Sequence, residues 1–252
     1  MSGWFVVSLR PVGQHATVRR AALEWGASTI SLPGLRLRAR EDAITRRALA
    51  DALNCERVIF SSPAAVRSAT PLQSLATIRK PMVLAVGRGT SAALRRAGIC
   101  AVLTPAAETS EGLLALPELR HVAGVSIGLV TAPGGRGLLA TTLRARAADL
   151  RIAEVYTREP ARLTRRHSEA LLDAKGSGAL LLSSAEALAN VLAALPVTAR
   201  QRLFECLVVV SSERLAGIAR DAGFARIVPA TSASPRAMLN ALAAHAKSAS
   251  FR

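Results

Sequence analysis

Short apolar runs alternate with segments of helical periodicity along the whole chain. The runs are continuous instead of alternating with polar residues, which is typical of strands buried on both faces of a parallel sheet. Strands are predicted at residues 4–9, 28–32, 57–60, 83–86, 101–103, 126–131, 152–156, 179–182, 207–210 and 226–228. Helices of about 10 to 14 residues fit between them, and this alternation predicts an α/β fold.

The chain also contains an internal repeat. Residues 7–11 (VSLRP) correspond to residues 129–133 (LVTAP), and residues 58–62 (VIFSS) correspond to residues 180–184 (LLLSS), both at an offset of 122 positions. Two similar α/β units are therefore predicted, and the repeat by itself places their boundary near residue 122. A chance match between two alanine-rich sequences is the alternative.

Each repeat places small residues between a predicted strand and the helix that follows it. The four such turns are residues 61–62, 87–91, 183–184 and 211–212. Helix N-termini carry free backbone N–H groups and partial positive charge, so small residues there suit an anion. Simple helix capping by Ser and Thr is the other interpretation. Ligands of parallel sheets bind beyond the carboxyl ends of the strands, which favours a binding role for the four turns together.

Composition narrows the class of ligand. The 252 residues, half of them hydrophobic, are enough for a core without disulfide or metal support. Lys and Arg number 33 against 17 Asp and Glu, and 30 of the bases are arginines, so the net charge of +16 predicts an anionic partner. Aromatic residues make up only 3%, with Tyr156 as the single tyrosine, which argues against stacking of single-stranded nucleic acid.

The sequence disfavours several other classes of protein. No signal-peptide pattern or long apolar span is seen, so a cytoplasmic protein is expected. Cys55, Cys100 and Cys206 lie in apolar surroundings and are expected to be reduced core thiols. The four histidines show no metal-ligand spacing, so no metal is predicted. No catalytic triad or paired-carboxylate motif is visible.

Two glycine-rich segments imitate nucleotide-binding motifs. Residues 87–92 (GRGTSA) match a dinucleotide fingerprint, with Glu108 about 20 residues further on. Glu108 is expected in a loop beyond the next strand instead of at its end, which disfavours a nicotinamide cofactor. Residues 133–137 (PGGRG) lack the Lys-Ser/Thr ending of a phosphate loop and are expected to form a flexible turn with an exposed arginine.

Taken in order, seven segments resemble the uroporphyrinogen-III synthase family over nearly the whole chain. They are residues 9–11, 58–66, 85–94, 110–113, 155–158, 182–184 and 232–235. The resemblance implies two flavodoxin-like parallel-sheet domains joined by a two-stranded linker, one domain being inserted in the other. Residues 1–36 with 161–252 would form the first domain and residues 37–160 the second, with linker strands at about 35–40 and 155–160.

The resemblance also implies the reaction. Members of the family need no cofactor. They take the linear tetrapyrrole hydroxymethylbilane, invert its last pyrrole ring and close the macrocycle to uroporphyrinogen III. The substrate loses its terminal hydroxyl to give an azafulvene, passes through a spiro intermediate and recloses, whereas without enzyme it closes uninverted. Its eight carboxylates are held in a cleft between the domains, largely by backbone N–H groups.

Individual residues are transferred from the family by position. Tyr156 matches a linker tyrosine proposed to assist departure of the hydroxyl, either as an acid or by orienting it. Substrate contacts are expected from Arg10, Ser61, Ser62, Gly87, Thr90, Ser183, Ser184 and Ser234. The family more often has Thr at position 234. Ala132 and the pair 184–185 also depart from its pattern.

The expected partner is therefore the polycarboxylate hydroxymethylbilane, with a transient contact to hydroxymethylbilane synthase and no nucleic acid or membrane. The chain is expected to be a monomeric cytoplasmic lyase of haem biosynthesis. Two alternatives remain at this point. One is a non-catalytic two-domain protein that binds anions or nucleic acid, and the other is a nicotinamide-dependent oxidoreductase.

Overall fold

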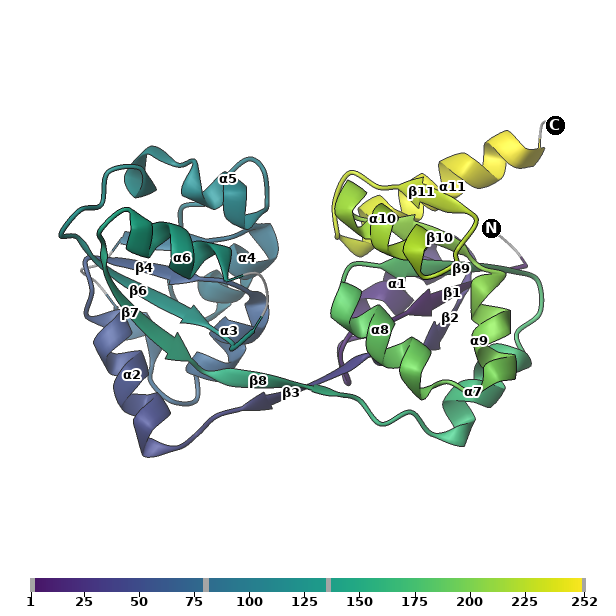
Figure 1. The fold of residues 1–252 in the computed structure, drawn as a ribbon, viewed down its shortest axis with the longest axis horizontal. Coiled ribbons are helices and arrows are strands. Elements are labelled where there is room, and N and C mark those ends of the chain that lie inside the picture. The colour runs from purple at the N-terminus through teal and green to yellow at the C-terminus, as the bar shows by residue number, and fades with distance from the viewer. Residues whose placement is uncertain (1–2, 79–81, 135–136, 251–252) are drawn as a thin grey trace. The chain divides into compact units, whose positions relative to one another are not determined.

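The computed structural model describes residues 3–78, 82–134 and 137–250. Two compact units make up the chain: unit 1 comprises residues 1–36 and 159–252, and unit 2 comprises residues 37–158. Each unit contains its own parallel sheet (Figure 1). The predicted α/β class with two parallel-sheet domains is confirmed.

The sheet of unit 1 has the strand order β11-β10-β9-β1-β2, and all its strands are parallel. The strands are β1 (Trp4–Ser8), β2 (Ser28–Ser31), β9 (Ser177–Leu182), β10 (Leu207–Val210) and β11 (Ile227–Pro229). The helices are α1 (Ala16–Glu24), α7 (Arg165–Leu172), α8 (Ala185–Ala194), α9 (Val197–Phe204), α10 (Glu213–Asp221) and α11 (Pro235–Ser250).

The core of unit 1 forms because alternate strand residues point to opposite faces of the sheet. Val6, Leu181 and Val209 pack with Val18 of α1 and Leu239 of α11 on one face. Helices α8 and α9 lie on the opposite face (Figure 1). The carboxyl ends of β1, β9 and β10 therefore meet at one edge between two helical layers.

The sheet of unit 2 has the strand order β5-β4-β6-β7, again all parallel. The strands are β4 (Arg57–Phe60), β5 (Met82–Ala85), β6 (Ser126–Thr131) and β7 (Asp149–Glu154). The helices are α2 (Ala43–Leu53), α3 (Pro63–Ala69), α4 (Arg88–Arg96), α5 (Ser110–Leu114) and α6 (Leu138–Ala145), with short 3-10 turns η1 (Leu75–Thr77) and η2 (Pro117–Leu119).

Neighbouring residues of β4 serve the two cores of unit 2. Val58 and Phe60 pack in a cluster with residues of α2, α3 and α4, whereas Ile59 packs in a separate cluster with residues of α5 and α6. All three side chains are fully buried. A strand buried on both faces explains why its sequence is continuously apolar.

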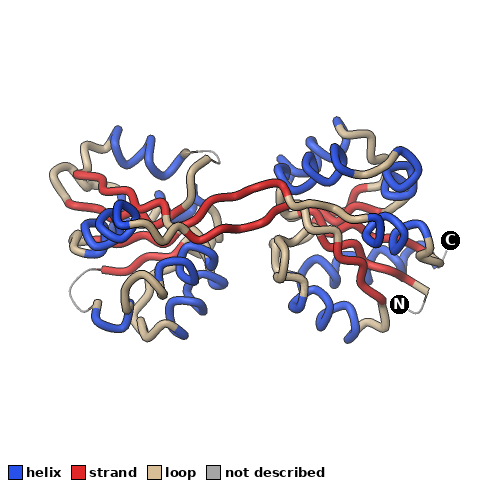
Figure 2. The backbone as a smooth tube through the Cα atoms, turned by 90° about the horizontal axis from the view of Figure 1, so that it is seen from below, coloured by secondary structure: helices blue, strands red, loops and turns tan. Residues whose placement is uncertain are grey.

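Two further strands, β3 (Leu35–Ala39) and β8 (Tyr156–Pro160), pair as a two-stranded sheet (Figure 2). The chain passes from one unit to the other along these strands. Gly34, just before β3, lies against α8: a Cβ atom added there would stand 2.4 Å from the carbonyl oxygen of Ala187. Only glycine allows this close approach.

The repeat corresponds to strands at matching places in the two sheets. By offset, β1 and β2 correspond to β6 and β7, and β4 and β5 correspond to β9 and β10. In the structure β1 pairs with β9, and β4 pairs with β6. Each unit therefore combines part of the first repeat with part of the second, and a boundary near residue 122 is wrong because that residue lies inside unit 2.

Three other predictions are corrected. Residues 101–103 form no strand and make only an isolated bridge from Leu103 to Leu84. The predicted strand at residues 152–156 is two strands, β7 and β8, separated at Val155. Cys100 is exposed, while Cys55 and Cys206 are buried as expected. Burial raises the pKa of Cys206 to about 11 and also raises that of Cys55.

Candidate functional site

The turn between β4 and α3 has its two serine hydroxyls bound to other groups. Ser62 caps α3: its Oγ accepts a hydrogen bond from the Ala65 N–H at 3.1 Å. Pro63 follows at the first helical position, where its missing N–H costs nothing. Ser61 Oγ donates to Thr131 Oγ1 at 2.8 Å, which links the carboxyl ends of β4 and β6.

Tyr156 lies behind this turn. Its side chain is 3% exposed and packs in the same cluster as the residues of α2, α3 and α4. Its hydroxyl stands 3.1 Å from Ser62 Oγ. The guanidinium carbon of Arg158 lies 5.9 Å from the ring centroid, a cation–π distance. Two predicted site residues, 94 positions apart in the chain, are therefore hydrogen-bonded.

A pocket of about 490 Å³ opens beside the same turn, a size typical of small-molecule sites. Its polar lining comes from Ser61, Ser62, Ser110, Thr131, Arg144, Glu154 and Arg158. Its apolar lining includes Leu129, Leu138 and Ile152. The arrangement offers hydroxyl and guanidinium donors around an apolar floor, which suits a ring system that carries carboxylates.

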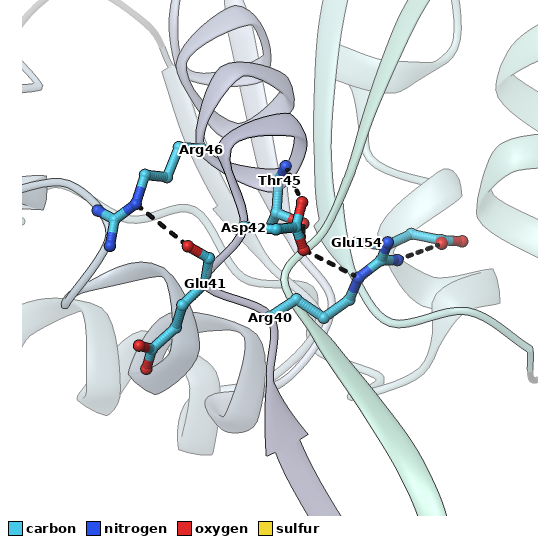
Figure 3. A network of polar contacts seen from close by, with 6 residues as sticks. All are labelled: Arg40, Glu41, Asp42, Thr45, Arg46 and Glu154. Carbon is cyan, nitrogen blue, oxygen red and sulfur yellow. Dashed lines mark hydrogen bonds and ion pairs between the residues drawn. The ribbon is translucent and has the colours of Figure 1, made fainter.

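Glu154 is the one acid among the described residues that line this pocket. Its carboxylate pairs with Arg40 Nη1 at 3.4 Å, and Arg40 Nε lies 3.9 Å from Asp42 (Figure 3). Asp42 in turn caps α2 through Thr45, and hydrogen bonds from Thr45 lower the pKa of Asp42. Arg40 therefore offsets the negative charge of Glu154 beside the pocket.

The next turn, between β5 and α4, already holds a carboxylate. Glu108 Oε2 accepts from the Arg88 N–H at 3.0 Å, and Oε1 accepts from Arg88 Nε at 2.5 Å. A Cβ atom at Gly87 would lie 2.6 Å from Glu108 Oε2, so glycine makes room for this contact. Thr90, one turn into the helix, is 4% exposed.

Glu108 thus caps α4 from a loop, and sequence reasoning missed this role. The loop position itself is as predicted. A carboxylate that covers the helix N-terminus occupies the place where a dinucleotide fingerprint binds pyrophosphate, which disfavours a nicotinamide cofactor at this turn.

In unit 1 the predicted residues lie at the ends of β1 and β9 and before α11. Ser184 caps α8, with its Oγ accepting from Ala187 N–H at 3.2 Å, and Ser183 precedes it. Ser234 Oγ accepts from Ala237 N–H at 3.2 Å and from Ser232 Oγ at 3.1 Å.

Arg10 links the end of β1 to the loop before α11. From the end of β1 it donates through Nη2 to the Ala233 carbonyl at 2.7 Å, in the loop that contains Ser234. Burial lowers the pKa of Arg10. The observed partner is a neutral carbonyl, which leaves the positive charge of this guanidinium unneutralised by that contact.

His15 is a buried polar residue that the sequence did not single out. It is 6% exposed, and its Nδ1 lies 3.0 Å from the hydroxyl of Ser8, at the end of β1. Burial lowers the pKa of His15 to about 4, and the charges of Arg19, His167 and Arg10 act in the same direction. His15 is therefore a neutral hydrogen-bonding group at neutral pH.

The predicted glycine-rich turn at residues 133–137 includes residues 135–136, which lie outside the described residues. Among the residues that the structure describes, no three His, Cys, Asp or Glu side chains gather as a metal site. Within the same ranges, no helix combines the length and apolar character needed to cross a bilayer.

Comparison with known proteins connects the site to a family. The family model described as "Uroporphyrinogen-III synthase HemD" matches residues 17–240. A uroporphyrinogen-III synthase of Salmonella typhimurium is 35% identical over 164 residues, covering 64% of this chain and 67% of the relative. The Escherichia coli K12 uroporphyrinogen-III synthase is 34% identical over 166 residues, covering 65% of this chain and 68% of that relative.

Solved structures agree on the fold. A uroporphyrinogen-III synthetase from Helicobacter pylori matches with a TM-score of 0.65 at 15% identity, covering 97% of this chain and 99% of that one. A mutant uroporphyrinogen III synthase from the extremely thermophilic bacterium Thermus thermophilus matches with a TM-score of 0.63 at 18% identity, covering 98% and 100%.

Proposed function

The chain belongs to the uroporphyrinogen-III synthase family, and we propose that it performs the family's reaction with the hydroxyl and arginine groups at the carboxyl ends of its strands. It is a cyclising lyase of tetrapyrrole biosynthesis that converts hydroxymethylbilane to uroporphyrinogen III. The observation that supports the residue assignment best is the pocket beside Ser62, where donors and two arginines surround an apolar floor.

The proposed division of roles follows from chemistry. Ser61 and Ser62 in unit 2, and Arg10, Ser183, Ser184 and Ser234 in unit 1, bind substrate carboxylates and ring edges. Gly87 and Thr90 join this set where a substrate carboxylate replaces that of Glu108 at the start of α4. Arg144 and Arg158 are added to this set because guanidinium groups pair with carboxylates in a bidentate manner. Tyr156 and Ser62 assist departure of the terminal hydroxyl, since their hydroxyls form a pair at the pocket.

Positioning supplies most of the proposed rate effect. The free substrate closes at the unsubstituted carbon of its last ring, so the enzyme must hold a conformer in which the substituted carbon lies nearer to the cationic centre. Fixing two reacting groups at contact distance removes much of the entropic barrier. The apolar side chains Leu129, Leu138 and Ile152 in the pocket would keep water from the azafulvene.

The test is an isomer assay. Purified protein is mixed with freshly prepared hydroxymethylbilane, the products are oxidised to porphyrins, and the type I and type III isomers are separated by chromatography. We expect the type III isomer to dominate, with type I alone in a sample without protein. Only type I in both samples would overturn the proposed activity.

We further propose that the protein acts as a cytoplasmic monomer that receives its substrate through a transient contact with hydroxymethylbilane synthase. Light scattering should give a mass near 26.4 kDa. A dimer mass at micromolar concentration would contradict the monomer, and an unchanged rate when the synthase supplies substrate directly would contradict the contact.

A further inference from the structure

Tyr156 and Ser62 differ in their access to the pocket. Tyr156 is 3% exposed and is not among the residues that line the pocket, whereas half-buried Ser62 lines it. The two hydroxyls are 3.1 Å apart. A ligand in the pocket therefore meets Ser62, with the Tyr156 hydroxyl behind it.

The hydrogen bonds of Ser62 determine where its proton points. A serine hydroxyl has one proton to donate and two lone pairs to accept with. One lone pair accepts the Ala65 N–H at the start of α3. When the Tyr156 hydroxyl donates to the other, both lone pairs are used, and the Ser62 proton is left for a third partner. Because Ser62 lines the pocket, a ligand there can be that partner.

We propose that Ser62 is the catalytic residue that donates a proton to the departing hydroxyl of the substrate, and that Tyr156 is a positioning residue that acts only through Ser62. The inference rests on the proposed function and refines it, because the family resemblance leaves open whether Tyr156 acts as an acid or only orients the departing hydroxyl. It makes Ser62 the first member and Tyr156 the second member of a two-proton relay.

Bonds, electrons and protons balance over the relay. The C–O bond of the terminal hydroxymethyl group breaks with its electron pair leaving on oxygen, and that oxygen takes the Ser62 proton to become water. Ser62 takes the Tyr156 proton at the same time, so a phenolate remains and the substrate becomes the cationic azafulvene. The final ring closure releases one proton from a pyrrole α-carbon, and this proton restores Tyr156 through Ser62.

The surroundings suit a transient negative charge on Tyr156. Arg158 lies over its ring, and the charge of Arg67, one turn along α3, interacts with the phenol. The N-terminus of α3 points its positive end at Ser62. Positive groups that act on both hydroxyls of the relay favour donation toward the pocket.

The experiment uses the whole 252-residue chain and compares four single variants and one double variant. Ser62→Gly removes the hydroxyl but keeps the helix, since glycine is a tolerated N-cap. Ser62→Thr keeps the hydroxyl in an extended backbone that Thr adopts readily. Tyr156→Phe removes the second hydroxyl. Thr164→Gly, which removes a capping hydroxyl from α7, is the control for cap loss alone.

We expect Ser62→Gly and Tyr156→Phe each to lower kcat by about 10²-fold with little change in KM, as loss of a general acid does. The Ser62→Gly/Tyr156→Phe double variant should lose no more than about threefold beyond either single variant, because the two residues act as a unit. Ser62→Thr should recover kcat to within a few-fold, and Thr164→Gly should retain it.

Two results would overturn the relay. One is a Ser62→Gly enzyme that keeps its kcat while Tyr156→Phe loses it, which would mean that Tyr156 reaches the substrate itself. The other is additive losses in the double variant. Both require a wild-type protein that forms the type III isomer, so failure of the relay is distinguishable from failure of the proposed function.

Discussion

Several arginines in this protein bind main-chain carbonyls, and one of them, Arg202, also pairs with Glu205. Arg46 donates to the carbonyl of Leu72, Arg146 to that of Leu114, and Arg202 to that of Ala174. Each contact links a helix to a loop or helix end that is distant in the chain, and such carbonyls are often unpaired. Part of the arginine excess is therefore structural, although the sequence suggests only a field for anions.

His15 makes the stability of unit 1 sensitive to acid. Its pKa is about 4 in the folded protein against 6.5 in an unfolded chain, so between these values the unfolded chain binds a proton that folded His15 does not. Stability is fully present above pH 6.5 and is lost as the pH falls toward 4. From pH 7 to pH 5 we expect this residue to remove about 1–2 kcal/mol from the free energy of unfolding.

Urea unfolding followed by tryptophan fluorescence measures this effect, because Trp4 and Trp25, the only tryptophans, both lie in unit 1. His15→Gln should reduce the loss between pH 7 and pH 5, while replacement of exposed His121 by Gln should leave it as in the wild type. Asp42 and Glu56, whose pKa values are lowered, add their losses only at more acidic pH. An equal pH dependence in His15→Gln would show that His15 is not the sensor.

At the scale of elements, strands were predictable where burial is two-sided. The strand at residues 57–60 is β4 as predicted, since each of its apolar residues meets a helix on one face or the other. The strand predicted at residues 101–103 does not form, because only Leu103 reaches the sheet. Leu103 lies at the edge of the sheet and is 39% exposed. Local sequence does not distinguish a strand at the edge of a sheet from one at its centre.

Contacts between elements were the part that the sequence could not show. The Ser62–Tyr156 hydrogen bond and the Glu108 cap on α4 join residues 94 and 20 positions apart. The first pairing has no periodic or motif signal, and the spacing of the second matches a dinucleotide fingerprint that implies a different role for Glu108. The site was therefore predictable as a set of turns, through strand-end position and family resemblance, but its hydrogen bonds were not.

Replacement by alanine should change the free energy of unfolding in opposite directions at Gly34 and at Gly217. A Cβ atom at Gly34 would lie 2.4 and 2.6 Å from the backbone oxygen and Cα of Ala187 in α8, whereas at Gly217 in α10 nothing lies within 4 Å. Gly34→Ala should lower the free energy of unfolding of unit 1 by about 1–3 kcal/mol. Gly217→Ala should raise it by about 0.5–1 kcal/mol through helix propensity.

The same tryptophan fluorescence measurement serves both glycines, since both lie in unit 1. Far-UV circular dichroism of the two variants should remain that of the wild type, which checks that the fold is kept. A stability unchanged by Gly34→Ala would mean that the segment before β3 can move away from α8 at little cost.

At the scale of the molecule, the repeat predicted two units but could not say which halves pair. Parallel strands are joined by crossover connections, so strands that follow one another in the chain need not be neighbours in the sheet. By sequence alone, β1 could therefore pair with strands of either repeat. The structure combines β1 and β2 with β9 and β10 in one sheet, and β4 and β5 with β6 and β7 in the other. The family resemblance supplied this arrangement because local sequence contains no such information.

The net charge of +16 should act on substrate capture at long range. The substrate carries eight carboxylates, and opposite charges that attract before contact raise the association rate in a manner that salt screens. The screening length falls from about 30 Å at 0.01 M salt to about 10 Å at 0.1 M. We therefore expect kcat/KM to fall several-fold over this range while kcat changes little.

Two variants separate this field from contacts in the pocket. Arg19→Glu/Arg20→Glu, on the exposed part of α1, reduces the net charge without touching the pocket and should flatten the dependence of kcat/KM on salt. Arg144→Gln, in the pocket lining, should raise KM at every salt concentration and leave the slope nearly unchanged. If the α1 variant keeps the wild-type slope, the arginine excess serves the fold, as it does at Arg46 and Arg202, and not the capture of substrate.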